Sequence, residues 1–399
     1  MGRIRGRTIA GVAALVATAA IGVAWLWLAS RPPDPAALLA RAQADFQAGR
    51  HEDARRALDL LATVRPPRPM DRMARAQVAQ AQGRDDDAVA EAGAILDDPA
   101  LGPLAHLLAG RVEIARHRLR PAEAHFLKAA EGLPGEPQPH EELAYIYNLQ
   151  HRWADFDRVM LALSDRRALT FERLAHWGKS RHAAWNPRED CEVLAACVAA
   201  DPDDRASRLV LAEGLYRMND VRGAEEALAP LPADDIDAVA LRASFAVERG
   251  DDEEAERLLR DVPPDAAAPA EVRARLALKR GDVEAAVAGF RLALTARPED
   301  RGLLHGLGTA LRLAGDPDAA AECFRAAELH DALFPLIARA ATTEGTRDPT
   351  LPPRLSAACA AAGRLPEALA WARLALADDP LDREAQATAH RLERELGPR

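Results

Sequence analysis

The chain has 399 residues, of which 49% are hydrophobic, 4% aromatic and 29% charged, with 28 prolines and four cysteines. This composition excludes a disordered, collagen-like or disulfide-stapled chain, and the scarcity of aromatic residues favours thin helical layers over one thick core. Lys and Arg number 52 against 62 Asp and Glu, so the net charge is −10. Because nucleic acids select a basic protein face, this acidic chain is predicted to bind no nucleic acid.

An uncharged apolar segment lies near the start of the chain. Residues 8–29 would span roughly 33 Å as a helix, at about 1.5 Å per residue, which is enough to cross a bilayer. Residues 1–7 contain three arginines, and Trp25 and Trp27 lie where an interfacial aromatic belt would be. We therefore expect a single-pass signal-anchor in the cytoplasmic (inner) membrane. Its N-terminus would lie inside, and the rest of the chain would be extracytoplasmic.

A cleaved signal peptide is the competing interpretation of this segment. The apolar region of a signal peptide is usually about 7–15 residues long and ends in a small-x-small site. Residues 8–29 are longer and end in Trp, Leu and Ala. A lipoprotein anchor needs a cysteine close behind the apolar stretch, whereas the first cysteine is Cys191. Residues 30–34 form a short linker, because their prolines cannot continue the membrane helix.

Most of the remaining chain follows a repeat of 34 residues. Ala54, Ala88 and Ala122 are in register, each 34 residues after the last. In this frame the sixth and seventh units are three residues short. The ten units are 35–68, 69–102, 103–136, 137–170, 171–204, 205–235, 236–266, 267–300, 301–334 and 349–382.

The end of the repeat array is irregular. Residues 335–348 form an insertion before the tenth unit. Residues 330–343, which run into this insertion, are apolar and fit a short packed helix or an ordinary linker equally well. Residues 383–399 form a C-terminal cap and tail, with a polar helical pattern over 383–396 that suits the terminal cap of a repeat array.

Four positions in the unit have a physical explanation. The eighth residue is small in all ten units, and the twentieth is Ala in all but two, where Phe156 and Asp190 stand. Small residues on two antiparallel helices let the backbones approach, and an apolar twenty-fourth residue fills the gap. The fifteenth residue is Gly in six units, where a helix would end in the left-handed conformation. The pattern therefore predicts a helical hairpin in each unit.

This pattern, together with prolines at the thirty-second position, resembles the tetratricopeptide repeat, most clearly in residues 117–134 and 281–298. The resemblance covers residues 35–382. It implies an all-α fold, an α-solenoid in which about ten hairpins stack into a right-handed superhelix. The chain departs from the family at the fourth position, which lacks an aromatic residue, and at the seventh, which is Arg in several units. The fifth and sixth units match the pattern weakly.

The sequence contains no signature of catalysis. A Walker-type phosphate loop, a GxSxG elbow, an HExxH motif and a GxGxxG loop behind a strand are all missing. The acidic runs 85–87 and 251–254 fall where second helices begin, and carboxylates there favour the helix dipole. We therefore expect no catalytic residue, no metal and no cofactor.

The cysteines are predicted to be small buried thiols. Cys191 and Cys197 are six residues apart on one predicted helix, a rise of roughly 9 Å, whereas a disulfide needs Cα atoms within about 7 Å. Those two residues should not pair. Cys323 and Cys359 fall on helices of adjoining units, so a bridge between them stays open as an alternative.

The resemblance also implies a partner-binding groove, because first helices in that family line a concave surface at positions 2, 5, 9, 12 and 13. Carried over to this chain, the centre of the groove would hold Arg111, Tyr145, Asn148, Lys179, His182, Tyr216 and Arg217. All three tyrosines lie in the fourth to sixth units, and interfaces favour Tyr, Trp and Arg. Tyr147, Trp153 and Trp177 occupy positions where a structural role is expected.

These patterns predict a membrane-anchored, non-catalytic tetratricopeptide scaffold. It would bind a protein or peptide on the extracytoplasmic side, in envelope assembly, secretion or complex maturation. The alternative is an accessory subunit of an envelope enzyme or polysaccharide export complex, whose groove contacts glycan through aromatic side chains. A free-standing enzyme is the third and least favoured interpretation.

Overall fold

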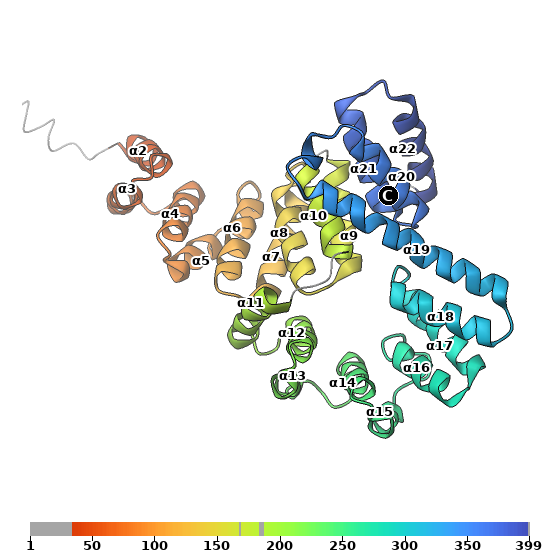
Figure 1. Ribbon diagram of the computed structural model, residues 1–399. Coiled ribbons are helices and arrows are strands. Elements are labelled where there is room, and N and C mark those ends of the chain that lie inside the picture. The colour runs from red at the N-terminus through yellow and green to blue at the C-terminus, as the bar shows by residue number, and fades with distance from the viewer. Residues whose placement is uncertain (1–33, 167–168, 183–186, 398–399) are drawn as a thin grey trace, which may run out of the picture. The chain divides into compact units, whose positions relative to one another are not determined.

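The computed structural model describes residues 34–166, 169–182 and 187–397, and over these residues it is helical throughout (Figure 1). The chain divides into two compact units, residues 1–112 and 113–399, with the boundary inside α6. The predicted anchor over residues 8–29 lies outside the described residues. Over the described ranges, no helix combines the length and the apolar character needed to cross a bilayer.

The first unit consists of successive helical pairs. Helix α2 packs against α3, and α4 packs against α5. Its helices are α2 (Pro35–Gln47), α3 (His51–Val64), α4 (Pro69–Ala81), α5 (Asp85–Gly93) and most of α6 (Gly102–Ala115). The core between them is made largely of alanine and a few larger apolar residues, among which Ala54, Ala76 and Ala88 are fully buried.

The second compact unit also consists largely of helical pairs. Helix α8 packs against α9, α12 against α13, α14 against α15, α16 against α17, α18 against α19, and α20 against α21. Its first helices are α7 (Leu119–Gly132), α8 (Gln138–Leu149), α9 (Trp153–Asp165), α10 (Phe171–His182), α11 (Pro187–Ala200), α12 (Arg205–Arg217), α13 (Val221–Leu228), α14 (Ile236–Glu248) and α15 (Asp252–Leu259). They are followed by α16 (Ala270–Arg280), α17 (Val283–Ala296), α18 (Arg301–Leu313), α19 (Pro317–Ala340), the 3₁₀ helix η1 (Gly345–Arg347), α20 (Leu351–Ala361), α21 (Leu365–Asp378) and α22 (Arg383–Leu396).

The predicted close packing within the pairs is confirmed. All eight alanines at the twentieth repeat position are at most 1% exposed. At the eighth position of the ninth unit, a Cβ on Gly308 would lie only 2.7 Å from the Phe324 ring. A side chain larger than hydrogen would therefore separate α18 from α19.

The helix boundaries follow from local chemistry. Among the helix starts that the structure describes, these aspartates accept a backbone N–H of the helix through their side chains: Asp34, Asp204, Asp220, Asp235, Asp251, Asp282, Asp300, Asp316 and Asp382. The six glycines predicted to end helices all have positive φ, between 68° and 82°. At the same repeat position His117, His151 and Asn219 are also left-handed, with φ of 59°, 51° and 64°. The repeat geometry therefore imposes this conformation even where glycine is missing.

The arginines at the seventh repeat position link neighbouring units. Arg75 donates a hydrogen bond to the Leu58 carbonyl at 2.9 Å, in the middle of the preceding unit's second helix, α3. Arg273 donates to the carbonyls of Leu259 (3.3 Å) and Val262 (2.6 Å). The departure from the family at this position thus has a structural reason. The Arg273 guanidinium satisfies carbonyls at and beyond the end of α15 that have no donor within the helix, whereas Arg75 adds a second donor to a carbonyl inside α3.

The packing changes in the fifth unit. Helix α10 packs against α19 and α21, whereas α11 packs against α12 (Figure 1). Helix α9 also packs against α21. Within the second compact unit, the tenth repeat unit therefore lies against the fourth and fifth repeat units. The alanine pattern breaks in the same place, at Phe156 on α9 and Asp190 on α11.

Helix α19 is longer than a repeat helix. It runs from Pro317 to Ala340, past the expected end of the ninth unit at residue 334 and into the predicted insertion. The packed-helix alternative for residues 330–343 therefore holds as far as Ala340, as a continuation of α19. Pro335 removes one backbone donor, but Leu333 and Ile337 on either side are buried and hold the helix in place. Helix α22 confirms the predicted helix over 383–396.

Candidate partner-binding surface

Tyr145 is the most exposed aromatic side chain of α8. Its neighbours Ala144, Ile146 and Tyr147 are buried, whereas Tyr145 is 46% exposed. Partial burial raises the pKa of the Tyr145 hydroxyl, and the negative charge of Asp190 on α11 adds to the rise. The ring of Tyr145 therefore lies close to α11 while much of it stays open to solvent.

The turn between α8 and α9 places an imidazole beside an indole. The rings of His151 and Trp153 stack, with centroids 5.0 Å apart and planes 18° apart. Burial lowers the pKa of His151, although the carboxylates of Glu213 and Asp190 oppose the shift and Arg217 adds to it. Groups from α11 and α12 thus lie around this turn.

Buried hydrogen bonds hold α8 against the start of α12. The Gln150 amide donates to an Asp204 carboxylate oxygen at 3.1 Å and to the Ser207 hydroxyl at 3.1 Å. Asp204 is 1% exposed and also accepts the Ser207 backbone N–H at 3.1 Å, which begins α12. Because this buried carboxylate accepts from both backbone and side-chain donors, these hydrogen bonds fix the position of α12 relative to α8.

A second link joins α7 to the end of α11. Arg120 binds Asp201 through two hydrogen bonds of 2.8 and 2.7 Å between residues 81 positions apart. The Arg120 guanidinium holds the pKa of Asp201 below its usual value. With the Gln150 contacts, this bidentate pair positions α11 and α12 beside α8.

We call the resulting cluster the junction surface. It consists of Tyr145, His151, Trp153, Asp190, Glu213 and Arg217. It combines a half-exposed tyrosine, a stacked imidazole and indole, two carboxylates and a guanidinium. Such a set offers aromatic contact area together with groups of both charges, which is the composition typical of interface hot spots.

The junction surface unites some of the predicted groove residues. Tyr145 and Asn148 lie on α8, with Asn148 half-buried, and Arg217 on α12 lies near them through its interaction with His151. Tyr216 is packed against α14. Its ring stacks on Phe245 with centroids 3.8 Å apart, and its hydroxyl donates to the Phe245 carbonyl at 3.0 Å. Tyr216 therefore joins the sixth and seventh repeat units.

Other predicted groove residues lie elsewhere. Lys179 is exposed on α10 beside His176, whose pKa is lowered by burial and by the Lys179 charge. Arg111 is exposed on α6 in the first unit. His182 ends α10, and its side chain is outside the described part of the chain. The structural roles expected for Tyr147 and Trp177 are supported, because both are buried and Trp177 donates to Asp157 at 2.8 Å.

The sequence did not single out His151, Asp190 or Glu213. Two of them interrupt the repeat pattern, since His151 replaces the usual glycine at the fifteenth position and Asp190 replaces the alanine at the twentieth. Read as signals, these breaks would have pointed to the junction surface. Glu213 has no such break, but it occupies groove position 9, as Tyr145 does, so the same carried-over positions would have included it.

The four cysteines are unpaired thiols. The prediction that Cys191 and Cys197 do not pair is confirmed, and no bridge joins Cys323 to Cys359. Burial raises the pKa of Cys191 to about 11 and that of Cys197 to about 12, so both stay protonated and unreactive at neutral pH. Across the described ranges, no group of three or more His, Cys, Asp or Glu is placed to hold a metal ion.

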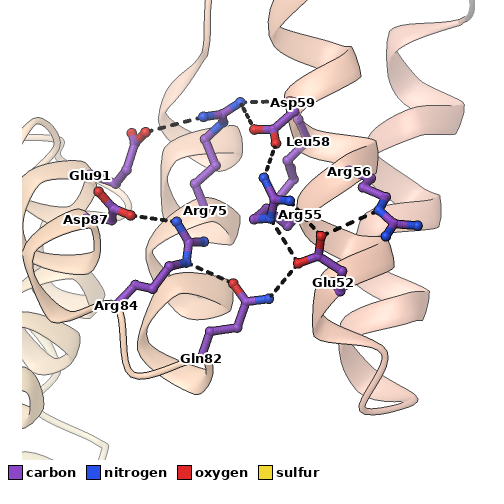
Figure 2. A network of polar contacts seen from close by, with 10 residues as sticks. All are labelled: Glu52, Arg55, Arg56, Leu58, Asp59, Arg75, Gln82, Arg84, Asp87 and Glu91. Carbon is purple, nitrogen blue, oxygen red and sulfur yellow. Dashed lines mark hydrogen bonds and ion pairs between the residues drawn. The ribbon is translucent and has the colours of Figure 1, made fainter.

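A different polar network covers the first unit, where it joins α3, α4 and α5 (Figure 2). Arg75 lies between Asp59 at 3.2 Å and Glu91 at 3.6 Å. Glu52 binds Arg55 at 2.6 Å, and this hydrogen bond lowers the pKa of Glu52 to about 2. Most of these side chains are well exposed, so the network marks a solvated surface rather than a site.

No protein-family model matches the chain, and no curated protein matches its sequence. Among solved structures, the chain is similar to the APC/C hetero-tetramer Cut9–Hcn1, with 13% identity and a TM-score of 0.36 over 95% of this chain and 81% of that chain. A tetratricopeptide repeat protein from Parabacteroides merdae is 15% identical, with a TM-score of 0.32 over 61% of this chain and 98% of that chain. The human IFIT1 dimer with m7Gppp-AAAA is 16% identical, with a TM-score of 0.35 over 90% of this chain and 89% of that chain. These TM-scores are low, and it is the helical pairs of the described residues that define the fold.

Proposed function

We propose that this protein is a membrane-anchored, non-catalytic tetratricopeptide scaffold whose junction surface binds a protein or peptide partner. The observation that carries the proposal is the position of Tyr145. Its ring is 46% exposed on a helix whose other aromatic side chain, Tyr147, is only 4% exposed. An exposed tyrosine with charged groups around it has no packing role to explain it and suits an interface.

The location of this scaffold is part of the proposal and rests on the sequence. Residues 8–29 would anchor it in the cytoplasmic membrane, and the helical units would lie in the extracytoplasmic space, in an envelope-assembly, secretion or complex-maturation setting. Alkaline phosphatase fused after Arg399 should then be active and a cytoplasmic reporter at the same place inactive. The reverse result would place the units on the cytoplasmic side.

Photo-crosslinking in the native membrane tests the partner-binding role. A photoreactive residue at Tyr145 should capture a discrete protein, identified by mass spectrometry. The control probe replaces Arg257, which is 62% exposed on α15 and pairs only locally with Glu254. Equal capture from both positions, or no protein adduct from Tyr145, would contradict the proposal.

A glycan-binding accessory subunit is the second candidate. It is favoured by one observation, the combination of the aromatic rings of Tyr145 and Trp153 with the carboxylate of Asp190, which suits sugar stacking and hydroxyl hydrogen bonds. A glycan adduct at the Tyr145 probe, together with glycan binding that Tyr145→Ala abolishes, would favour this candidate over the protein scaffold.

A further inference from the structure

The contact between α21 and the α9–α10 pair differs chemically from the apolar stacking contacts between neighbouring helical pairs of the second unit. Ordinary unit-to-unit contacts here are made by alanine, leucine and phenylalanine, as around Phe290 and Leu307. The α21 contact instead contains tryptophans and several charged groups. Its residues lie up to 209 positions apart in the chain.

The centre of this contact is a buried arginine. Arg364, 3% exposed at its side chain, binds Glu367 at 2.6 Å and Glu299 at 3.1 Å. The Glu367 side chain is itself 1% exposed. The negative charge of Asp157 on α9 is among the carboxylate charges that raise the pKa of Arg364. One guanidinium thus joins the start of α21 to the α17–α18 connection.

The aromatic residues complete the contact. Trp371 on α21 is fully buried and lies edge-on to Phe171 of α10, with ring centroids 5.3 Å apart. On α10, a Cβ at Gly178 would come within 3.0 Å of both a Glu367 carboxylate oxygen and the Ile337 side chain. The surface of α10 is therefore shaped to accept α21 closely, since a larger residue at position 178 would hold the helices apart.

A partly exposed ion pair closes the edge. Arg373 of α21 binds the Asp165 carboxylate at the end of α9 and lies 3.4 Å from the Ser164 hydroxyl. It also binds Glu393 of α22 at 2.9 Å, and its side chain is 28% exposed. This edge can be changed without disturbing the buried centre.

The composition of this contact makes it easier to separate than an apolar one. Charged groups that lose water on burial regain it on opening, so a contact rich in ion pairs is held less firmly than an apolar contact of the same area. Helix α20 packs on α21 and α21 on α22, and α20 also packs against α19, to which residues 341–350 join it, so α19 is the side about which these helices can swing. They can therefore leave α9 and α10 together, as a local opening unit.

We propose that α20–α22 form a clasp that covers a helix-binding surface on α9 and α10. When the clasp opens, this surface binds an amphipathic partner helix of the same chemistry as α21. Such a helix carries a tryptophan that packs against Phe171 and an arginine that pairs with Asp165. The acidic Asp157 and Asp165 on α9 and the space above Gly178 are the features that select it. This surface is separate from Tyr145, so its test does not depend on the function proposed above.

Hydrogen exchange on the full-length protein tests the opening. Arg373→Glu should speed amide exchange in α9, α10 and α20–α22 at least tenfold and leave α12–α17 unchanged. Adding Asp165→Arg and Glu393→Arg should restore slow exchange, because both ion pairs of residue 373 are then re-formed with their charges swapped. The matched control is Arg222→Glu on α13, which turns an exposed ion pair with Glu226, at 2.7 Å and four residues away, into two like charges.

Peptide binding tests the surface itself. A labelled peptide of residues 362–379 should bind the Arg373→Glu protein at least tenfold more tightly than the wild-type protein, in which the clasp covers the surface. The same peptide with Trp371→Ala and Arg373→Glu should not bind. Exchange that rises uniformly across the second unit would show that α21 belongs to the global core and overturn the clasp. Fast local exchange without peptide binding would overturn the helix-binding surface.

Discussion

The first unit and the α9–α21 region of the second unit are built from the same alanine-rich helices but use their charges differently. The polar network of the first unit joins residues no more than 30 positions apart, on a solvated surface (Figure 2). In the second unit, a buried arginine reaches a carboxylate 65 positions away, and an edge pair spans 208 positions. Regularly stacked repeat units contact only their neighbours in the sequence. The contact between distant repeat units differs, because it contains charged side chains that are buried or partly buried.

Removal of the buried arginine should have the largest effect. Arg364→Ala leaves Glu367 and Glu299 without their cation and is expected to lower the free energy of unfolding by about 3–5 kcal/mol. Urea unfolding followed by tryptophan fluorescence would report it, since Trp177 and Trp371 are both fully buried. Glu52→Gln in the exposed network of the first unit is the matched control and should leave the unfolding midpoint unchanged. Equal effects of the two variants would remove the distinction between the regions.

The double variant Arg364→Met with Glu367→Leu refines the same comparison. It replaces the ion pair by apolar side chains of similar length, so neither charge is left buried alone. It should recover most of the stability that Arg364→Ala loses. Failure to recover would mean that Glu299 and Asp157 depend on the Arg364 charge more than on the space it fills.

The seventh-position arginines allow one repeat position to be compared in both units. Arg273→Ala removes hydrogen bonds to several helix-end carbonyls, at 2.6 Å for Val262 and 2.7 Å for Pro263, and should cost about 2 kcal/mol. Arg75→Ala in the first unit removes one carbonyl hydrogen bond, to Leu58, and two partly exposed ion pairs, to Asp59 and Glu91, and should cost about 1 kcal/mol. Urea unfolding of both variants measures the difference. An equal cost would show that the number of carbonyl contacts does not matter.

The Arg120–Asp201 pair makes the stability of the contact between α7 and the end of α11 depend on pH. The folded pKa of Asp201 lies below its ordinary value of 3.8, so the pair stabilises the fold above that pH. Its contribution is lost as the pH falls through the lower, folded pKa. Asp201→Asn should lower stability by about 1 kcal/mol at neutral pH, because Arg120 is half exposed, and should flatten the loss of stability below about pH 4. An unchanged acid profile would contradict this role of Asp201.

Replacement of the left-handed histidines by glycine should change the stability of the protein least. Unlike the substitutions above, it is not expected to destabilise the protein. His117→Gly relieves a positive φ of 59° and is expected to stabilise the protein by roughly 0.5–1 kcal/mol. His151→Gly relieves a similar strain but loses the stack on Trp153, so its net effect should be near zero. Thermal unfolding of both variants tests this. Equal stabilisation would mean that the His151–Trp153 stack contributes nothing to folding.

The regular part of the fold could be predicted because its determinants are local. Alanines such as Ala54 and Ala286 pack two adjacent helices, and glycines such as Gly281 end them, so both properties are set within one unit. The separation of α10 from α11 could not be predicted in this way. It depends on Trp371 and Arg373, which lie some 200 positions further along the chain, and a repeat pattern holds no information about such distant pairs.

The candidate site could be predicted only in part, for the same reason. Tyr145 and Arg217 follow from the groove positions of the repeat. Tyr216 has the same repeat position as Asn148, but its use depends on Phe245 in the next unit, on which it stacks. The group around His151 forms only because Gln150 and Asp204 bring α8 and α12 together.

The return of α21 to α9 sets a timing problem for biosynthesis. Asp165 and Arg373 are 208 residues apart, so at about 5–20 residues per second the ribosome needs roughly 10–40 s to make the second after the first. During that interval Phe171 and Trp177 have no α21 to cover them, although α10 itself can already be helical. Nascent chains of this protein are therefore expected to bind a chaperone at α10, and to release it only once the C-terminal helices have emerged.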